Sequence, residues 1–246
     1  MHKIKVIIAL LFLIPLFFAC NEEGPVSNDP QVSSDADFSE QFAKRGGNYA
    51  EFEITIENMT PATAPGASQP FSPPVIATHT PFFKIFRLGQ FASDELRQLA
   101  EDAVNGPMIN SLSNSDFVYD VVEGAGGPIF PGTSQTFTVK TKLPFNKLSL
   151  VSMLVNTNDA FVGANSVRLP LFGSRVYYLK VYDAGTERNT ESAMHIPGPC
   201  CGSPHVRVPT HERIRFHEGI QGYGNLDPTV YGWDEPAAKL IITRIK

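Results

Sequence analysis

The segment at residues 51–57, EFEITIE, alternates polar and apolar residues without exception. Strict alternation is typical of a strand with one buried face, so Phe52, Ile54 and Ile56 are predicted to point into a core. Similar strand-like patterns occur at 117–122, 136–140, 148–155, 175–182 and 239–245. Glycine, proline, asparagine and aspartate separate these segments. The pattern therefore predicts an all-β fold, an antiparallel β-sandwich with many loops.

Two features add detail to this sandwich. Residues 148–155 are apolar on both faces of the predicted strand, which favours a central position in a sheet. One stretch has the periodicity of a helix, with Ser93 as a suitable N-cap. The apolar residues that recur there at helical spacing are Leu96, Leu99, Ala100 and Ala103. One face of this helix is predicted to pack on a sheet, and the Asn-Gly-Pro segment at 105–107 is predicted to end it. We therefore expect one or two short helices beside the strands.

The first 19 residues predict a signal peptide of the lipoprotein type. A short basic start is followed by the apolar run 6–18, which is too short for a membrane-spanning helix. Ala19 directly precedes Cys20, as in a bacterial lipoprotein cleavage box, and Phe17 stands where that box usually has leucine. We expect Cys20 to become the lipidated N-terminus, which would anchor the protein stably. An ordinary signal peptide followed by a leftover cysteine is the alternative.

The predicted mature chain has two parts. Residues 20–48 are polar and rich in proline and glycine, a composition that predicts a disordered tether. Residues 49–246 are enough for one sandwich domain. The expected location is the bacterial cell envelope, as an outer-membrane lipoprotein facing the periplasm or the cell surface. Membrane contact is expected through the lipid anchor only, because the sequence has no other apolar run of spanning length.

The charge argues against one class of partner. The whole chain has a formal net charge of −5, and the loss of residues 1–19 removes two lysines and no acids, which moves the charge to −7. An acidic protein with scattered lysine and arginine has no basic surface of the kind that binds phosphates. Nucleic acid is therefore not expected as a partner.

Three acids lie in two short, turn-like segments. Asp159 belongs to NDAFVG at 158–163, whereas Asp183 and Glu187 belong to YDAGTE at 182–187. Gly185 lets the backbone turn sharply, so the last two carboxylates can point to one centre. Ca²⁺ takes roughly six to eight oxygen ligands, which such acids could supply together with carbonyls and water. The spacing is not that of an EF-hand, and solvated turn residues are the alternative interpretation.

Several segments of the chain resemble the spondin domain, a module of F-spondin and of many secreted or lipid-anchored bacterial proteins. The matching segments are 52–58, 71–74, 77–79, 99–102, 131–132, 152–155, 158–163, 182–187 and 209–212. They follow the family's order over most of the domain. The resemblance implies a β-sandwich similar to C2 domains. It also implies a role in extracellular interaction or adhesion, with an unknown protein or glycan as partner, rather than an enzymatic activity.

The same resemblance implies a calcium site. Animal members of the family bind Ca²⁺ with an aspartate before Phe-Val-Gly and with two acids of a Tyr-Asp-Ala-Gly-Thr-acid segment. These positions correspond to Asp159, Asp183 and Glu187. The chain departs from the animal members at Glu187, where they have aspartate, so this carboxylate reaches one methylene further.

Histidines near the C-terminus suggest a rival function. The histidines of this region are His195, His205, His211 and His217. His205, His211 and Glu212 could form the centre of a metal-dependent hydrolase. The zincin motif needs a helix, which Pro209 opposes, so surface histidines with local hydrogen bonds are the simpler interpretation. A carbohydrate-binding module, which shares the sandwich and the calcium, is a further alternative.

Two cysteines, Cys200 and Cys201, are left if Cys20 is lipidated. Because they are adjacent, a bond between them would close a small ring. A vicinal disulfide and two free thiols both fit the sequence. The chain has no CxxC pair, so a ribbon-type zinc site is not indicated.

Overall fold

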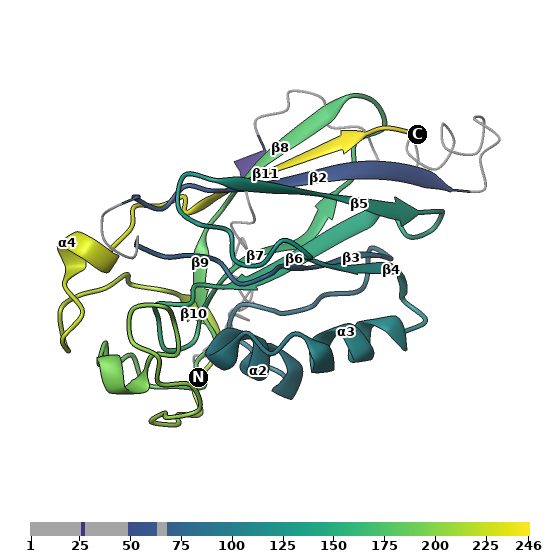
Figure 1. Cartoon of the computed structure of the whole chain (residues 1–246). Coiled ribbons are helices and arrows are strands. Elements are labelled where there is room, and N and C mark those ends of the chain that lie inside the picture. Colours follow the sequence, from purple (N-terminus) through teal and green to yellow (C-terminus); the bar gives the residue numbers. More distant parts are fainter. Residues whose placement is uncertain (1–25, 28–48, 63–67) are drawn as a thin grey trace, which may run out of the picture.

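The fold is a sandwich of two antiparallel sheets, seen in the computed structural model of the chain (Figure 1). The structure describes residues 26–27, 49–62 and 68–246. The predicted signal peptide, Cys20 and most of the predicted tether lie outside these residues. The prediction of an all-β sandwich with few short helices is confirmed.

The first sheet has five strands in the order β1-β8-β11-β2-β5. These are β1 (Val26–Ser27), β2 (Ala50–Asn58), β5 (Ser134–Thr141), β8 (Ser174–Leu179) and β11 (Ala238–Arg244). The alternating segment of the sequence forms β2, and its inward residue Ile54 lies opposite Ile242 of β11 and Phe137 of β5. Strand β1 falls within the predicted tether and pairs with β8.

The second sheet has six strands in the order β10-β9-β7-β6-β3-β4. These are β3 (Val75–His79), β4 (Val118–Glu123), β6 (Lys147–Met153), β7 (Ala160–Arg168), β9 (Val181–Asp183) and β10 (Arg215–Phe216). Every residue of β6 is buried, so the prediction of a central strand from its continuous apolar pattern is confirmed.

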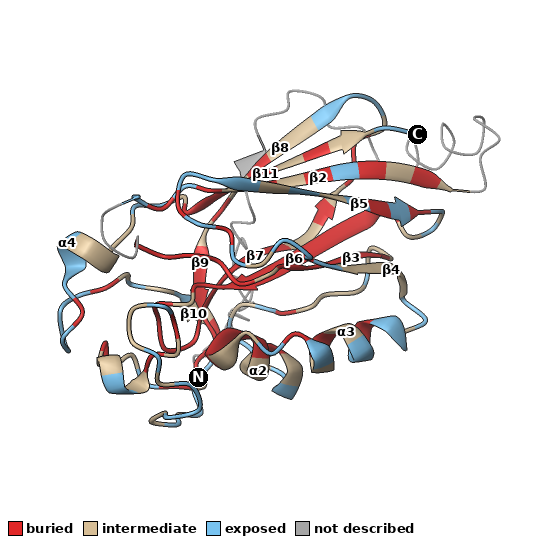
Figure 2. Ribbon diagram, viewed as in Figure 1, coloured by how far each residue is buried: buried red, intermediate tan, exposed pale blue. Residues whose placement is uncertain are grey.

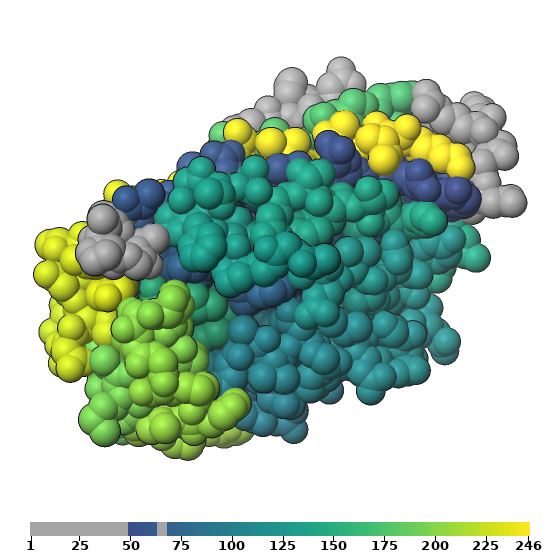
Figure 3. Space-filling model, in the orientation of Figure 1, coloured from purple at the N-terminus to yellow at the C-terminus, as the bar shows by residue number. Residues whose placement is uncertain are grey.

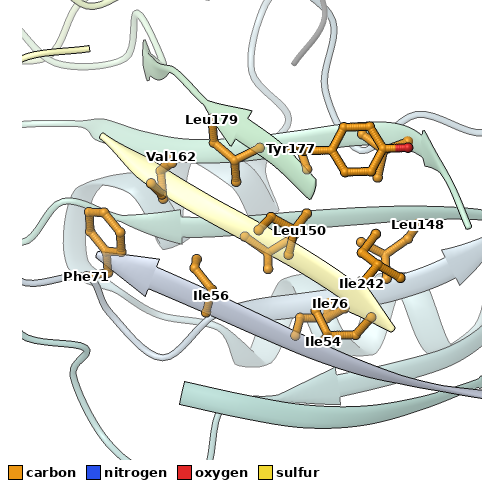
Figure 4. Packing of buried hydrophobic residues seen from close by; sticks show 14 of the residues in the cluster. Ile54, Ile56, Phe71, Ile76, Leu148, Leu150, Val162, Tyr177, Leu179 and Ile242 are labelled. Atoms are coloured by element: carbon orange, nitrogen blue, oxygen red, sulfur yellow. The ribbon is translucent and has the colours of Figure 1, made fainter. Parts of the chain in front are cut away.

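Apolar packing covers the second sheet on both faces, as the buried strands in Figure 2 show. Between the sheets, Ile54, Leu150 and Ile242 belong to one large cluster (Figure 4). On the opposite face, Leu96 of α2 (Asp94–Asp102) packs in a second cluster with Val151 of β6. The neighbouring residues Leu150 and Val151 therefore serve two different cores, because successive side chains of a strand point to opposite faces.

The start of the first helix was predicted correctly, whereas the role of the Asn-Gly-Pro segment after it was not. Ser93 Oγ accepts a hydrogen bond from the Leu96 N–H at 3.3 Å, and Ala103 ends α2 in the left-handed conformation. A second helix, α3 (Gly106–Ser113), begins almost at once with Pro107 in its first turn. Proline is tolerated there because first-turn N–H groups have no partner within the helix.

Among the described residues, the remaining helical turns are η1 (Ala193–His195) and α4 (Pro228–Tyr231). In the described part of the chain, no helix has the length and apolarity needed to cross a bilayer.

The segment 175–182 was predicted as one strand, and this is wrong. The chain forms β8 in one sheet, passes through Lys180 and continues as β9 in the other sheet. This change of sheet places Asp183 at the end of β9, beside the loops that gather at one end of the sandwich in Figure 1.

Truncation of the inter-sheet core should lower stability sharply. Leu150 has no exposed surface, so Leu150→Ala should reduce the free energy of unfolding by about 2–5 kcal/mol. Thr138→Ala removes an exposed side chain on β5 and should change it by less than about 0.5 kcal/mol. Urea denaturation measures both. Equal effects would contradict the assigned position of the core.

Candidate metal centre

The pairing of β7 with β9 brings the first two acids together. Asp159 directly precedes β7, and Asp183 is the last residue of β9. Ala160 lies opposite Asp183 in the antiparallel ladder, and the Ala184 N–H donates to the Asp159 carbonyl at 3.2 Å. Asp159 therefore lies at the end of the loop between β6 and β7, and the antiparallel register places the start of β7 beside the end of β9.

Gly185 turns the chain back toward the same place. Its φ of +72° favours glycine, and an added Cβ would lie 2.7 Å from the Glu212 carbonyl carbon and oxygen. The turn lets the backbone N–H groups of Thr186 and Glu187 both donate to Asp159 Oδ2, at 2.7 and 3.0 Å. The structure thus brings Asp159, Asp183 and Glu187 to one end of the sandwich.

All three acids are buried, with exposed fractions of 0% for Asp159 and Asp183 and 3% for Glu187. Burial and repulsion by the Asp183 charge raise the pKa of Asp159 to about 7. Burial raises the pKa of Glu187 to about 8, although Asn158 Nδ2 donates to Glu187 Oε1 at 3.1 Å. Burial also raises the pKa of Asp183, and the Arg215 guanidinium offsets this only in part. The cluster therefore holds more negative charge than its hydrogen bonds stabilise.

Two buried oxygens of this cluster have no hydrogen-bond partner, namely Asp159 Oδ1 and Asn189 Oδ1. Asp159 Oδ2 accepts from Thr186 Oγ1 at 3.2 Å as well as from two backbone groups, so the carboxylate is fixed while Oδ1 has no donor. Asn189 Nδ2 donates to Asp183 Oδ2 at 2.8 Å, which leaves the amide oxygen of Asn189 without a donor. Unpartnered buried oxygens of this kind suit a hard cation.

Sequence reasoning missed Asn189. The available signal was its position, two residues after Glu187 in the same segment, together with a side-chain oxygen. That signal is weak, because amides are common in turns whether or not they bind a metal.

The cluster does not have the arrangement of a complete metal site. Within the described ranges, no group of three or more His, Cys, Asp or Glu side chains is arranged to hold a metal ion. One reason is that both carboxylate oxygens of Asp183 already have partners. Oδ1 accepts from the Gly185 N–H at 2.7 Å, and Oδ2 lies 2.8 Å from both Arg215 Nη2 and Asn189 Nδ2. The donor set is nevertheless all oxygen and anionic, which fits Ca²⁺ better than a transition metal.

The residues of the hydrolase alternative have separate partners. His205 Nδ1 contacts Asp102 Oδ2 at 2.8 Å, His211 stacks on Phe91 with 4.2 Å between ring centroids, and Glu212 pairs with Arg215. His195 Nδ1 lies 2.9 Å from Thr190 Oγ1, and His217 Nδ1 accepts from the Gly219 N–H. Each histidine thus has local contacts of its own, but His217 is partly buried, unlike the surface histidines that the simpler interpretation of the sequence expects.

A disulfide loop lies beside the acid cluster. Cys200 and Cys201 are joined by a vicinal disulfide in the structure. The Cys200 N–H donates to Asn156 Oδ1 at 3.2 Å, and Asn158 Nδ2 donates to the His195 carbonyl at 3.4 Å. The loop is therefore hydrogen-bonded to the segment that leads into Asp159. Figure 3 shows the loops of this region as one block at an end of the molecule.

An apolar cavity of about 430 Å³ adjoins the same loop. Its lining includes Pro70, Ala103, Pro128, Phe130, Met153 and Pro199. Phe130 is 53% exposed, so this cavity opens to solvent through an apolar wall. Such a concavity is typical of a surface that binds other molecules.

The fold and the site together define a β-sandwich module with a buried acidic cluster among the loops at one end. The family model Spondin_N matches residues 53–213, which is more than half of the chain and includes all three acids. The chain belongs to the Spondin_N family, a family of non-enzymatic modules of the extracellular, adhesion type. Among curated proteins, none matches the chain.

Without a cation, stability should fall as the pH rises from 6.5 to 8.5. The folded-state pKa values of Asp159 and Glu187, about 7 and about 8, lie above their ordinary values of 3.8 and 4.5. The folded protein therefore binds more protons than the unfolded chain, and it loses this advantage as the two acids ionise. Urea denaturation in EDTA should show a loss on the order of 2 kcal/mol across this range.

Two histidines have the opposite effect on stability at lower pH. Burial lowers the pKa of His79 to about 4, below its ordinary value of 6.5, so this residue makes stability rise with pH between those values. The pKa of His217 is lowered in the same way. Above pH 6.5, Asp159 and Glu187 should determine how stability changes with pH. Constant stability between pH 6.5 and 8.5 in EDTA would contradict the raised pKa values.

Proposed function

We propose that this spondin module binds Ca²⁺ through Asp159, Asp183 and Glu187, with the Asn189 amide oxygen as an additional donor. The proposal rests mainly on Asp159 Oδ1, a fully buried carboxylate oxygen without a hydrogen-bond donor. The buried amide oxygen of Asn189, whose Nδ2 donates to Asp183, also has no donor. When bound, the ion would supply positive charge to acids that are otherwise stabilised only in part.

The effect of the cation would be structural. The acids lie directly before β7, at the end of β9 and in the turn after it, and the backbone of Glu187 forms an isolated β-bridge with Pro209. Ligation would therefore join several loops at one end of the sandwich. Because Asn156 and Asn158 connect the same segment to the disulfide loop, the cation would also order a wall of the apolar cavity.

We infer that this ordered end serves adhesion to a protein or glycan at the cell surface. The family match supports an adhesion-type module, and the open apolar cavity beside the disulfide loop supports binding at this end. No observation on the described residues favours a metal-dependent hydrolase or a carbohydrate-binding module over this function.

Calcium should raise the thermal stability of the purified protein. At a free concentration of about 100 times the dissociation constant, binding should add about 2.7 kcal/mol to the free energy of unfolding relative to EDTA. Asp159→Asn keeps the shape of the side chain and should abolish most of this gain. Asp116→Asn, which changes an exposed aspartate outside the cluster, should retain it.

Thermal melts of the wild type, Asp159→Asn and Asp116→Asn, each recorded with calcium and with EDTA, measure these differences. The proposal fails if the wild-type protein shows no calcium-dependent shift, or if Asp159→Asn keeps the full shift.

A lipid on Cys20 would place the module in the cell envelope. The Cys20→Ser variant should lose lipidation and move from the membrane fraction to the soluble fraction after cell lysis. Incorporation of a labelled fatty acid into the wild-type protein, and not into the variant, provides the matched readout. A variant that still sediments with membranes would refute the lipid anchor.

A further inference from the structure

Arg215 brings a positive charge into direct contact with the acid cluster. The β9–β10 ladder places Arg215 opposite Asp183, and Nη2 lies 2.8 Å from Asp183 Oδ2 (strands labelled in Figure 1). The Asp183 side chain is 1% exposed, whereas that of Arg215 is 43% exposed. The guanidinium therefore covers a buried carboxylate from the solvent side. Sequence reasoning missed this residue, which also lies beyond the family match at 53–213.

The same guanidinium has a second acid within reach. Arg215 Nη1 contacts Glu212 Oε2, and Glu212 is 53% exposed at its side chain. Arg215 is thus paired with one carboxylate inside the cluster, that of Asp183, and with one on the surface, that of Glu212. A small rotation away from Asp183 would leave it with an ionic partner.

We propose that Arg215 is the internal counter-ion of the acid cluster, and that a divalent cation binds by displacing its guanidinium from Asp183 to Glu212. This inference rests on the proposed calcium function and assigns to Arg215 the control of affinity. The reason is that both Asp183 oxygens have donors, and only Arg215 among those donors carries a charge that repels an incoming cation. Arg215 would stabilise the calcium-free protein and weaken calcium binding by the same free energy.

The test is the Arg215→Gln variant, with Arg213→Gln as the matched control. Arg213 is on the same segment but donates to the Gly89 carbonyl at 2.8 Å and lies over the Phe91 ring. Calorimetric titration with CaCl₂ should give a dissociation constant about tenfold lower for Arg215→Gln than for the wild type. Arg213→Gln, which removes the same charge, should stay within about twofold of the wild type.

A second readout separates displacement from simple charge removal. In EDTA, Arg215→Gln should be less stable than the wild type, and in saturating calcium the two should be equally stable, because the guanidinium has already left Asp183. Glu212→Gln alters an exposed side chain and should bind calcium several-fold more weakly, since Arg215 loses its second partner. In the Arg215→Gln background, the Glu212→Gln change should have little effect.

The outcomes are distinct. If the wild type binds no calcium, the proposed function and this inference both fail. If the wild type binds calcium and Arg215→Gln binds it equally or more weakly, the proposed function stands and the role of Arg215 is overturned. If Arg215→Gln does not fold, the same decision rests on Glu212→Gln: calcium affinity equal to that of the wild type would overturn the inference.

Discussion

The burial of three carboxylates at one point is the constraint on which this end of the molecule depends. A buried anion is costly unless hydrogen bonds or opposite charges replace its water. The chain supplies backbone N–H groups to Asp159, an amide to Glu187 and a guanidinium to Asp183. The pKa values of all three acids are raised nonetheless, so these donors do not balance the charge, and a bound cation would.

Ion pairs with buried acids also attach the C-terminal loops to the sandwich. Arg215 pairs with Asp183 of the second sheet, and Arg207 pairs with Glu101 and Asp102 at the end of α2. Two arginines of one loop region thus compensate acids that belong to different elements. The loops are held in part by these ion pairs, and the Arg215–Asp183 pair links their order to the state of the acid cluster.

Local patterning predicted β2 from its alternation of polar and apolar residues and β6 from its continuous apolar pattern. It missed β7, in which Gly163 leaves space for Phe86: an added Cβ would lie 2.8 Å from that ring. The acid positions came from the family resemblance, since their spacing alone is equally typical of turns. Asn189 and Arg215 were missed because their importance depends on which strands become neighbours. The β9–β10 register that places Arg215 opposite Asp183 is a long-range property of the fold.

We propose above that the acid cluster is a calcium site completed around Asp159. The most direct measurement is a crystal structure of the calcium-saturated protein, with data collected where calcium scatters anomalously. We expect an anomalous peak within bonding distance of Asp159 Oδ1, with Glu187 and Asn189 oxygens also turned toward it and Arg215 withdrawn from Asp183. The absence of a peak at the cluster, with Asp183 still paired to Arg215, would contradict it.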